Sequence, residues 1–455
     1  MLALPLEGHV NKSQPALTHL LEISPRAAIW RLALPTSLLG LTQSSYHLAN
    51  SWWVSFLGDD ALAALTSSSF ALWGLQALGE ICQTGVYSQV AQATGAGDVT
   101  RIRQTLGAGL VLLVGIAIST GLGLHLLAPF YLLELGLDPH TQVSQLARDY
   151  LQTFAWFTLP WMGLTVTNAT FRGLGDAKTP LKVSGATLLL TALLDPLLLM
   201  GVGPWPGLGI AGPAVATGIA NCCGLVAGLY LLGRRGFTPL LRSAILPQMA
   251  GLARLGLPLA MTGLGFNLVY VFLGRVLAPW SPHAMAALGL GHRLESPVYF
   301  LSAGLSVAAT TLVGQYVGAG RRAEVVGIAK TVAHEGLRWL WPLAALTTLG
   351  GSLWLRPFTQ DPQVLEWGGS YLFFNGIAQL FMMTELIFEG AFAGAGRTLA
   401  PLLISLPLTL LRLPLAWFFA DRLGLGPPGV FLAIALSTIL KGISLRGWFS
   451  RRGNT

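Results

Sequence analysis

The chain has 455 residues, of which 53% are hydrophobic and 10% charged, and its mean hydropathy is +0.63. A typical soluble domain carries about 25% charged residues, so this composition excludes a soluble globular protein. The net charge of +8 would suit nucleic-acid binding, but the positive residues follow the pattern of membrane loops, and we expect no nucleic-acid partner.

Windows of about 20 apolar residues predict twelve membrane-spanning helices and therefore an all-α polytopic membrane protein. The predicted spans, in chain order, cover residues 29–57, 61–86, 104–127, 147–171, 180–202, 208–232, 254–279, 284–312, 337–358, 367–390, 400–420 and 427–445. With an even number of spans, the two termini should lie on the same side of the membrane.

Lysine and arginine concentrate in alternate loops of this arrangement, for example at Arg101, Arg234 and Lys441, whereas the opposite loops carry acids such as Asp59 and Asp138. The positive-inside rule then places both termini in the cytoplasm, and we expect a bacterial plasma (inner) membrane location. The segment before the first span is mixed in polarity, and the first apolar run is too long for a signal peptide. We therefore expect no cleavable leader.

The two halves of the chain repeat each other at one offset. RLALP at Arg31 recurs as RLGLP at Arg254, ALAAL at Ala61 recurs as AMAAL at Ala284, and Gln92 recurs as Gln315, with the same offset of 223 in all three pairs. Two homologous halves of six spans each should run parallel to one another, with a transport site between them. The predicted units are an N-terminal segment at 1–28, a six-helix bundle at 29–235, a connector at 236–253, a second bundle at 254–447 and a tail at 448–455.

Several functional classes lack their sequence signatures. The chain has no GxxxxGK[ST] phosphate-binding loop, so an ATP-driven pump is not expected. Its three cysteines, Cys82, Cys222 and Cys223, fall inside predicted spans without metal-type spacing, and its eight histidines are scattered. We therefore predict neither catalytic residues nor a cofactor, and expect an ion gradient to supply the energy for transport.

A set of motifs in a fixed order resembles the multidrug and toxic compound extrusion (MATE) transporters over nearly the whole chain. The resemblance implies two six-helix bundles around a central cavity that export organic cations or other amphiphiles in exchange for protons or sodium ions. It also implies a monomer whose partners are small amphiphilic substrates and membrane lipids. The matching segments are residues 32–35, 56–65, 90–98, 171–180, 193–199 and 207–217 in the first half, and 293–296, 309–320, 390–401 and 412–417 in the second.

Asp195 is the strongest candidate for ion coupling. It lies in the middle of the fifth predicted span, where an ionisable group costs about 2.5 to 3.5 kcal/mol on insertion scales and is usually functional. Uptake of a proton or a metal ion changes the charge of such a carboxylate, and that change can select one conformation of the bundle. The alternative is a structural aspartate that is hydrogen-bonded to a neighbouring helix.

In the resembling family this aspartate works with an acid on the first helix, fifteen positions after the proline that is Pro35 here. That position is Asn50, which can ligate sodium through its carbonyl oxygen but cannot take up a proton. His47, three residues earlier, could replace the missing acid as a titrating group, or be an ordinary hydrogen-bonded histidine. The hydroxyls of Thr191 and Thr217 permit a sodium site composed of Asn50, Thr191, Asp195 and Thr217.

The second half offers weaker candidates for contact with substrate. Glu385 and Glu389 lie four residues apart on one helical face, although Glu389 could instead pair with Arg397 or Arg412. Glu295 could pair with His292 or Arg293. The remaining candidates for the substrate cavity are the polar Asn267 and, among aromatics that can stack on a cation, Trp52 and Tyr46.

The sequence therefore predicts an ion-coupled exporter that works by alternating access. The competing hypothesis is a flippase for a lipid-linked or amphiphilic metabolite. A long basic cavity or two additional spans would favour the flippase, and the sequence predicts neither.

Overall fold

The computed structural model describes residues 19–135, 137–202, 205–241, 245–277 and 279–452. Nearly all of these residues are helical, and nine of the helices formed by them are long and apolar enough to span a bilayer. The predicted all-α membrane fold is thereby confirmed, and the number of twelve spans stays a prediction.

The first-half elements are short α1 (His19–Glu22), α2 (Pro25–Ser55), α3 (Asp59–Gly95), α4 (Val99–Glu134), α5 (Gln142–Ala155), α6 (Thr158–Gly173), α7 (Lys178–Met200), the hairpin of β1 (Gly201–Val202) and β2 (Trp205–Pro206), and α8 (Ala211–Arg234). The second-half elements are α9 (Ile245–Leu277), α10 (Pro282–Gly318), η1 (Arg322–Glu324), α11 (Val325–Gly350), η2 (Gly351–Trp354), α12 (Pro362–Gly394), α13 (Leu399–Leu410), α14 (Arg412–Trp417), the π-helical turn η3 (Phe418–Arg422) and α15 (Pro427–Arg452).

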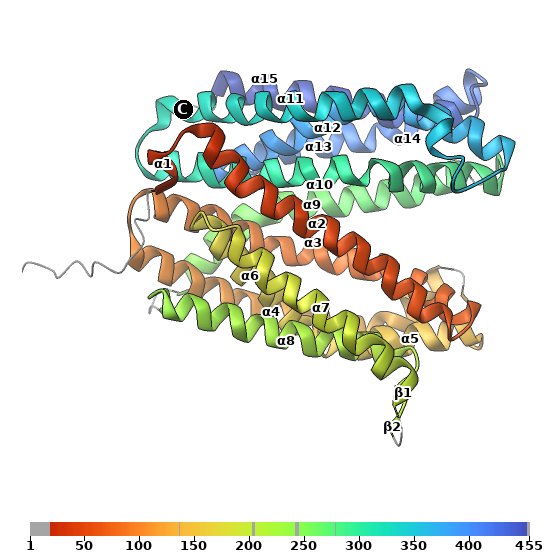
Figure 1. The fold of residues 1–455 in the computed structure, drawn as a ribbon, viewed down its shortest axis with the longest axis horizontal. Coiled ribbons are helices and arrows are strands. Elements are labelled where there is room, and N and C mark those ends of the chain that lie inside the picture. Colours follow the sequence, from red (N-terminus) through yellow and green to blue (C-terminus); the bar gives the residue numbers. More distant parts are fainter. Residues whose placement is uncertain (1–18, 136, 203–204, 242–244, 278, 453–455) are drawn as a thin grey trace, which may run out of the picture.

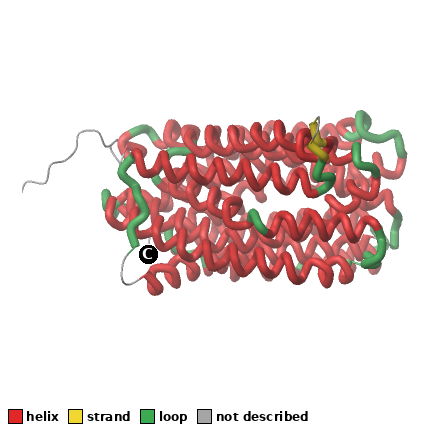
Figure 2. Tube along the Cα trace, turned by 90° about the horizontal axis from the view of Figure 1, so that it is seen from below, coloured by secondary structure: helices red, strands yellow, loops and turns green. Residues whose placement is uncertain are grey.

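The helices run side by side along the long axis of the molecule (Figure 2). Figure 1 shows α1 and the C-terminus at one end, which we call the termini end, and the β1–β2 hairpin at the opposite end. The same view shows α2 running diagonally, from the second-half helices at the termini end to the first-half helices at the opposite end. One helix therefore contacts both halves of the molecule.

Three predicted spans differ in detail from the helices that form. The span at 147–171 is two helices, because the backbone breaks at Trp156 and Phe157; the Thr158 hydroxyl donates to the Ala117 and Ala155 carbonyl oxygens beside the break, both at 3.0 Å. Helix α11 begins twelve residues before the span predicted at 337, since the charged residues of its first turns lower the local hydropathy. Helix α9 likewise begins at Ile245, inside the segment predicted as the connector.

At the termini end the halves are joined by two matching pairs of hydrogen bonds. In each pair a hydroxyl and an amide on one long helix donate to successive carbonyl oxygens at the end of a helix in the other half. The donors and acceptors are Ser88 to Ala393 (2.5 Å) and Gln92 to Gly394 (2.9 Å), and their two-fold counterparts Thr311 to Arg172 (3.1 Å) and Gln315 to Gly173 (3.2 Å). We call these four bonds the inter-half hydrogen bonds. They use carbonyl oxygens in the last turn of a helix, where accepting capacity remains, and they tie α3 to the end of α12 and α10 to the end of α6.

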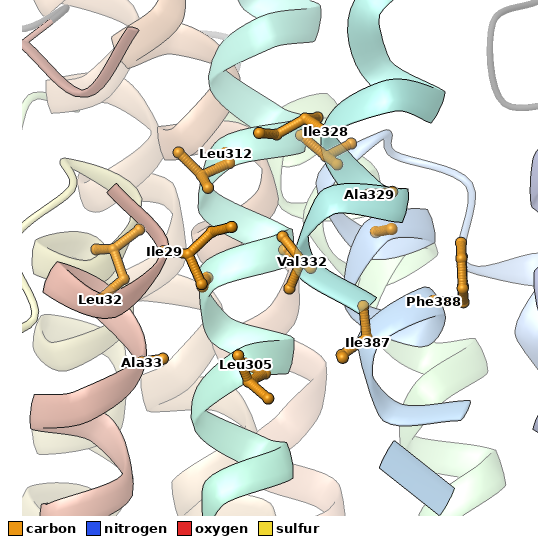
Figure 3. Close-up of a cluster of buried hydrophobic side chains, with 14 of the residues drawn as sticks. Ile29, Leu32, Ala33, Leu305, Leu312, Ile328, Ala329, Val332, Ile387 and Phe388 are labelled. Atoms are coloured by element: carbon orange, nitrogen blue, oxygen red, sulfur yellow. The ribbon is translucent and has the colours of Figure 1, made fainter. Parts of the chain in front are cut away.

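Hydrophobic packing closes the same end. Ile29, Leu32 and Ala33 of α2 lie in a cluster with second-half residues such as Leu305 and Leu312 of α10, as Figure 3 shows. By the same symmetry, Leu252 of α9 lies in the first-half cluster. The first turns of α2 and of α9 are thus each buried in the opposite half.

Gly318 lets α10 approach the backbone of α3. A Cβ atom at this position would overlap the carbonyl oxygen of Gln92, and a Cβ at Gly95 would likewise overlap that of Gln315. We expect Gly318→Ala to destabilise the protein by about 1 to 3 kcal/mol, the usual cost of overpacking. Thermal unfolding in detergent measures this, with Gly327→Ala as control, since a Cβ there meets nothing within 4 Å. An unchanged or higher unfolding temperature for Gly318→Ala would contradict the close packing.

The loop between α6 and α7 is organised by Asp176. Its carboxylate accepts from the backbone N–H groups of Lys178 (2.9 Å) and Thr179 (3.0 Å), from the Thr179 hydroxyl (2.5 Å) and from the Arg235 guanidinium (2.7 Å). Partial burial would raise the pKa of Asp176, but the hydrogen bonds from Thr179 and Arg235 outweigh it and hold the pKa below its ordinary value of 3.8. This supports a structural role in the loop rather than ligand binding.

A carboxylate with a lowered pKa stabilises the folded protein above its ordinary pKa, and this contribution is lost as the pH falls through the folded-state value. We expect Asp176→Asn to lower stability by about 1 kcal/mol at pH 7, because the ion pair is partly exposed, and the difference from wild type to shrink below pH 3.8. Thermal unfolding from pH 3 to pH 8 tests this. The exposed Asp149→Asn is the control, and an equal loss in both variants would refute the assignment.

Candidate functional site

The candidate ion site lies in the first half, where α2, α7 and α8 meet. Asp195 of α7 is fully buried, and its Oδ2 accepts a hydrogen bond of 3.1 Å from the Tyr46 hydroxyl of α2. The Tyr46 oxygen in turn accepts from Asn50 Nδ2 at 2.9 Å, and lies 3.5 Å from the Thr217 hydroxyl of α8. Because the Tyr46 hydroxyl donates its proton to Asp195, the Thr217 hydroxyl is the donor in its contact with the Tyr46 oxygen.

Two oxygens of this group lack hydrogen-bond partners. Asn50 Oδ1 and Asp195 Oδ1 are both buried, and neither has a partner in the described part of the chain. A buried acceptor without a donor costs about 1 to 3 kcal/mol, and a carboxylate costs more. A proton on Asp195, or a hard cation bound by both oxygens, would remove this cost, so the arrangement suits cation uptake.

The other predicted members of the site are placed less directly. Thr191 is buried one turn before Asp195, and its hydroxyl donates to the Thr187 carbonyl at 2.9 Å, so only its oxygen lone pairs remain for a cation. The His47 side chain is exposed, and its ring lies 5.7 Å from that of Tyr46 in a tilted arrangement. Tyr46, proposed from the sequence for the substrate cavity, is instead the residue that links Asp195 to Asn50.

A second buried polar group lies in the second half. Glu385 of α12 pairs with Lys441 of α15 at 2.5 Å, although the sequence analysis placed Lys441 among the loop charges. Arg412 donates to Ser437 (2.6 Å) and Thr438 (2.9 Å) rather than to Glu389, which accepts from Ser405 at 2.7 Å. These contacts tie α12, α13, α14 and α15 together.

The remaining predicted residues make other contacts. Glu295 pairs with His292 at 2.7 Å, as one of its two suggested partners. Asn267 of α9 is half-buried. Trp52 is 56% exposed and packs against Trp53 and Phe56 near the end of α2, with ring centroids 4.5 Å and 5.1 Å away, an arrangement typical of an aromatic belt at a membrane interface.

Sequence reasoning missed Glu80 of α3. Its carboxylate accepts from Thr84 at 3.3 Å, and its charge acts on Arg172 of the first half and on Tyr299 and Glu389 of the second. Glu80 falls inside the second predicted span, so the rule that identified the other intramembrane acids should also have found it. It places an acidic group close to residues of both halves.

The two-fold relation shows that the Asp195 group has no counterpart in the second half. At the offset of 223, the equivalents of Tyr46 and Asn50 are Val269 and Leu273. Helix α7 corresponds to α13 at an offset of 221. The hydrogen bond between Asn168 and Ser184 in the first half recurs at this offset as the hydrogen bond between Glu389 and Ser405. Helix α8 corresponds to α15 at an offset of 217, because Gly212 and Gly429 each pack closely against the backbone of the element that precedes their helix.

With these offsets, the equivalents of Asp195 and Thr217 are Ala416 and Ile434. Ala416 and Ile434 lie in one buried hydrophobic cluster with Val269 and Leu273. Apolar side chains thus replace Tyr46, Asn50, Asp195 and Thr217 in the second half, whereas the counterpart of Thr191 is the buried cation Arg412.

The MatE family model matches both halves, at residues 35–197 and 258–418. The chain belongs to the MATE family of transporters. A probable multidrug resistance protein NorM of Thermotoga maritima is 27% identical over 91% of this chain and 90% of its own length. An FAD transporter of Shewanella oneidensis is 28% identical over 91% and 92%.

Among solved structures, an outward-facing multidrug resistance MATE transporter of the MOP superfamily superposes with a TM-score of 0.85 at 22% identity, covering 97% of this chain and 98% of that one. This likeness shows the fold. Together with the family match, it makes the chain an integral membrane protein of a family of multidrug transporters.

The bond between Tyr46 and Asp195 can be measured by a double-mutant cycle. Tyr46→Phe removes the donor to the carboxylate, and Asp195→Asn removes the charge. We expect each to destabilise the protein, with a coupling energy of about 1 kcal/mol between them, since contacting residues are not additive. Chemical unfolding in detergent gives the four stabilities.

The matched cycle combines Tyr46→Phe with Glu295→Gln in the other half, for which we expect additivity within about 0.3 to 0.5 kcal/mol. If both cycles were equally additive, the hydrogen bond would contribute nothing to the site.

Proposed function

We propose that this MATE transporter exports amphiphilic organic cations in exchange for protons or sodium ions. The observation that carries the proposal is the buried Asp195 carboxylate, which is linked to Asn50 through the Tyr46 hydroxyl. Asp195 Oδ1 and Asn50 Oδ1 each have no hydrogen-bond partner in the described residues. The multidrug relatives support the substrate class. On this proposal the chain catalyses no covalent reaction and holds no cofactor.

Ion uptake at Asp195 would be transmitted through α2. Tyr46 and Asn50 lie on α2 at the ion site, whereas Ile29 and Leu32 of the same helix are buried in the second half. Pro35 lies inside the helix between these two regions, where a missing backbone N–H permits bending. A change in the charge of Asp195 that moves α2 therefore alters the packing that closes the termini end.

The inter-half hydrogen bonds and the packing around Ile29 hold the termini end closed. If that end is cytoplasmic, as the distribution of positive residues predicts, the transporter is in a state closed to the cytoplasm. We propose a monomer in a bacterial plasma membrane. The opposite state would require these contacts to separate while contacts form at the other end.

The second half has the apolar Ala416 in place of Asp195 and the cation Arg412 in place of Thr191. One cation site, in the first half, favours one coupling ion per cycle. Exchange of one proton for one monovalent cation is electroneutral and is driven by the pH gradient alone, at about 1.4 kcal/mol per pH unit. Because Asn50 replaces an acid, sodium bound by amide and carboxylate oxygens is equally consistent with the site.

A second candidate substrate class is an anionic aromatic molecule. The buried Arg412 lies over the rings of Phe266 and Tyr270, at 5.5 Å and 5.7 Å, and its Nη1 has no hydrogen-bond partner in the described residues. A guanidinium beside aromatic rings suits phosphate groups attached to a flat ring system. One relative is an FAD transporter, which makes this class worth testing beside the cations.

We expect purified protein in proteoliposomes to move a cationic dye under either an imposed pH gradient or an imposed sodium gradient. Asp195→Asn should reduce gradient-driven flux at least about tenfold, because it removes the charge that changes on ion binding. Dye fluorescence follows the transport, and FAD added as competitor tests the second substrate class. The control is Asp138→Asn, an equal charge change in an exposed loop.

Flux driven by one gradient alone would identify the coupling ion. Full activity of Asp195→Asn would refute the site, and no movement of dye under either gradient would refute cation export.

A further inference from the structure

The first half contains a polar hollow at the termini end, between α3, α4 and α9. Its volume is about 240 Å³, and its lining includes Gln89, Asp98, Arg101, Gln104 and Gln248. At about 30 Å³ for each molecule in the liquid, this is room for about eight waters or a group of similar size. Three amides, one carboxylate and one guanidinium therefore surround a space at one end of the bundle.

An apolar groove of about 560 Å³ continues along the same three helices. It is lined by Leu78 and Ile81 of α3, Leu112 and Ile116 of α4, and Met249 of α9. Met249 follows Gln248 of the polar hollow directly in the chain. The surface therefore changes from polar to apolar on passing from the termini end toward the middle of the helices.

The second half shows that the fold does not require this hollow. At the same offset of 223, Leu312, Ile328 and Ile29 are the two-fold equivalents of Gln89, Thr105 and Leu252 at the hollow. These three apolar side chains pack together in a buried cluster (Figure 3). The same position in the architecture is solid in one half and open and polar in the other.

The equivalent of the groove is also closed in the second half. Met249 and Leu112 correspond to Arg26 and Glu335, which form an ion pair of 2.7 Å. Ile116 corresponds to Trp339, whose ring packs edge-on against Trp30 with centroids 5.8 Å apart. An ion pair and two indoles, of which Arg26 and Trp339 remain partly exposed, cover the surface where the first half has its groove.

We propose that the polar hollow and the apolar groove together bind one phospholipid with an amine head group, such as phosphatidylethanolamine. Arg101 binds the phosphate, the Asp98 carboxylate accepts from the ammonium group, and the amides of Gln104 and Gln248 bind the glycerol ester oxygens. One acyl chain lies in the groove. The hollow carries one positive and one negative side chain, so its charges complement a zwitterionic head group.

The depth of the hollow fits this ligand. Gln89 lies six residues before the end of α3 at Gly95, which is about 9 Å along a helix. The head-group and interfacial region of one leaflet is about 5 to 7.5 Å thick, so Gln89 lies near its inner boundary if the end of α3 is at the membrane surface. A protein-bound lipid here would fill the space beside α9, whose first turns contact the first half.

Native mass spectrometry of delipidated protein, titrated with phosphatidylethanolamine or phosphatidylglycerol, tests the proposal without depending on transport. We expect one phosphatidylethanolamine to bind wild type more tightly than phosphatidylglycerol. Ile116→Trp places in the groove the side chain found at the equivalent position of the second half, and Arg101→Ala removes the phosphate partner. Each should weaken phosphatidylethanolamine binding about tenfold.

The matched control is Ile118→Trp, on the same helix but 60% exposed and outside the groove lining, for which binding should equal that of wild type. Unfolding temperatures check that the variants fold, and if Ile116→Trp does not, Arg101→Ala decides. Unchanged phosphatidylethanolamine binding in the folded variants, or tighter binding of phosphatidylglycerol than of phosphatidylethanolamine, would overturn the proposal.

Discussion

Inside a membrane protein, a polar group must find its partner on a neighbouring helix, because lipid offers none. That constraint explains where the helices of this transporter meet. The last carbonyls of α6 accept from Thr311 and Gln315, and those of α12 accept from Ser88 and Gln92. The two halves are joined where helix ends offer backbone oxygens to side-chain donors of the other half.

Asp195 is a buried carboxylate for which this constraint is not fully met. One of its oxygens accepts from Tyr46, and the other has no donor among the described residues. By contrast, the buried acid and base of the second half, Glu385 and Lys441, satisfy one another. A paired group contributes to structure, whereas an under-satisfied carboxylate can respond to an ion. The difference separates the proposed ion site from the structural polar core.

The duplication provides an internal comparison between the halves. The inter-half hydrogen bonds keep the symmetry, since both halves must contribute equally to one closed end. The interiors of the two halves do not keep this symmetry. Asp195 corresponds to Ala416 in a hydrophobic cluster, and the polar hollow around Gln89 corresponds to the packed side chains around Leu312. Both differences place a polar group in the first half where the second half has apolar side chains.

The sequence by itself determined the class of protein, the all-helical membrane fold, the duplicated halves and the candidate Asp195, because hydropathy, repeats and a charge inside an apolar span are properties of single segments. Only the tertiary structure showed that Tyr46 connects Asn50 to Asp195, that Lys441 is buried against Glu385, and that α2 packs in the second half. Those contacts join residues that lie far apart in the chain, and the neighbour that a side chain meets across two helices depends on their rotation and crossing, which no local pattern records.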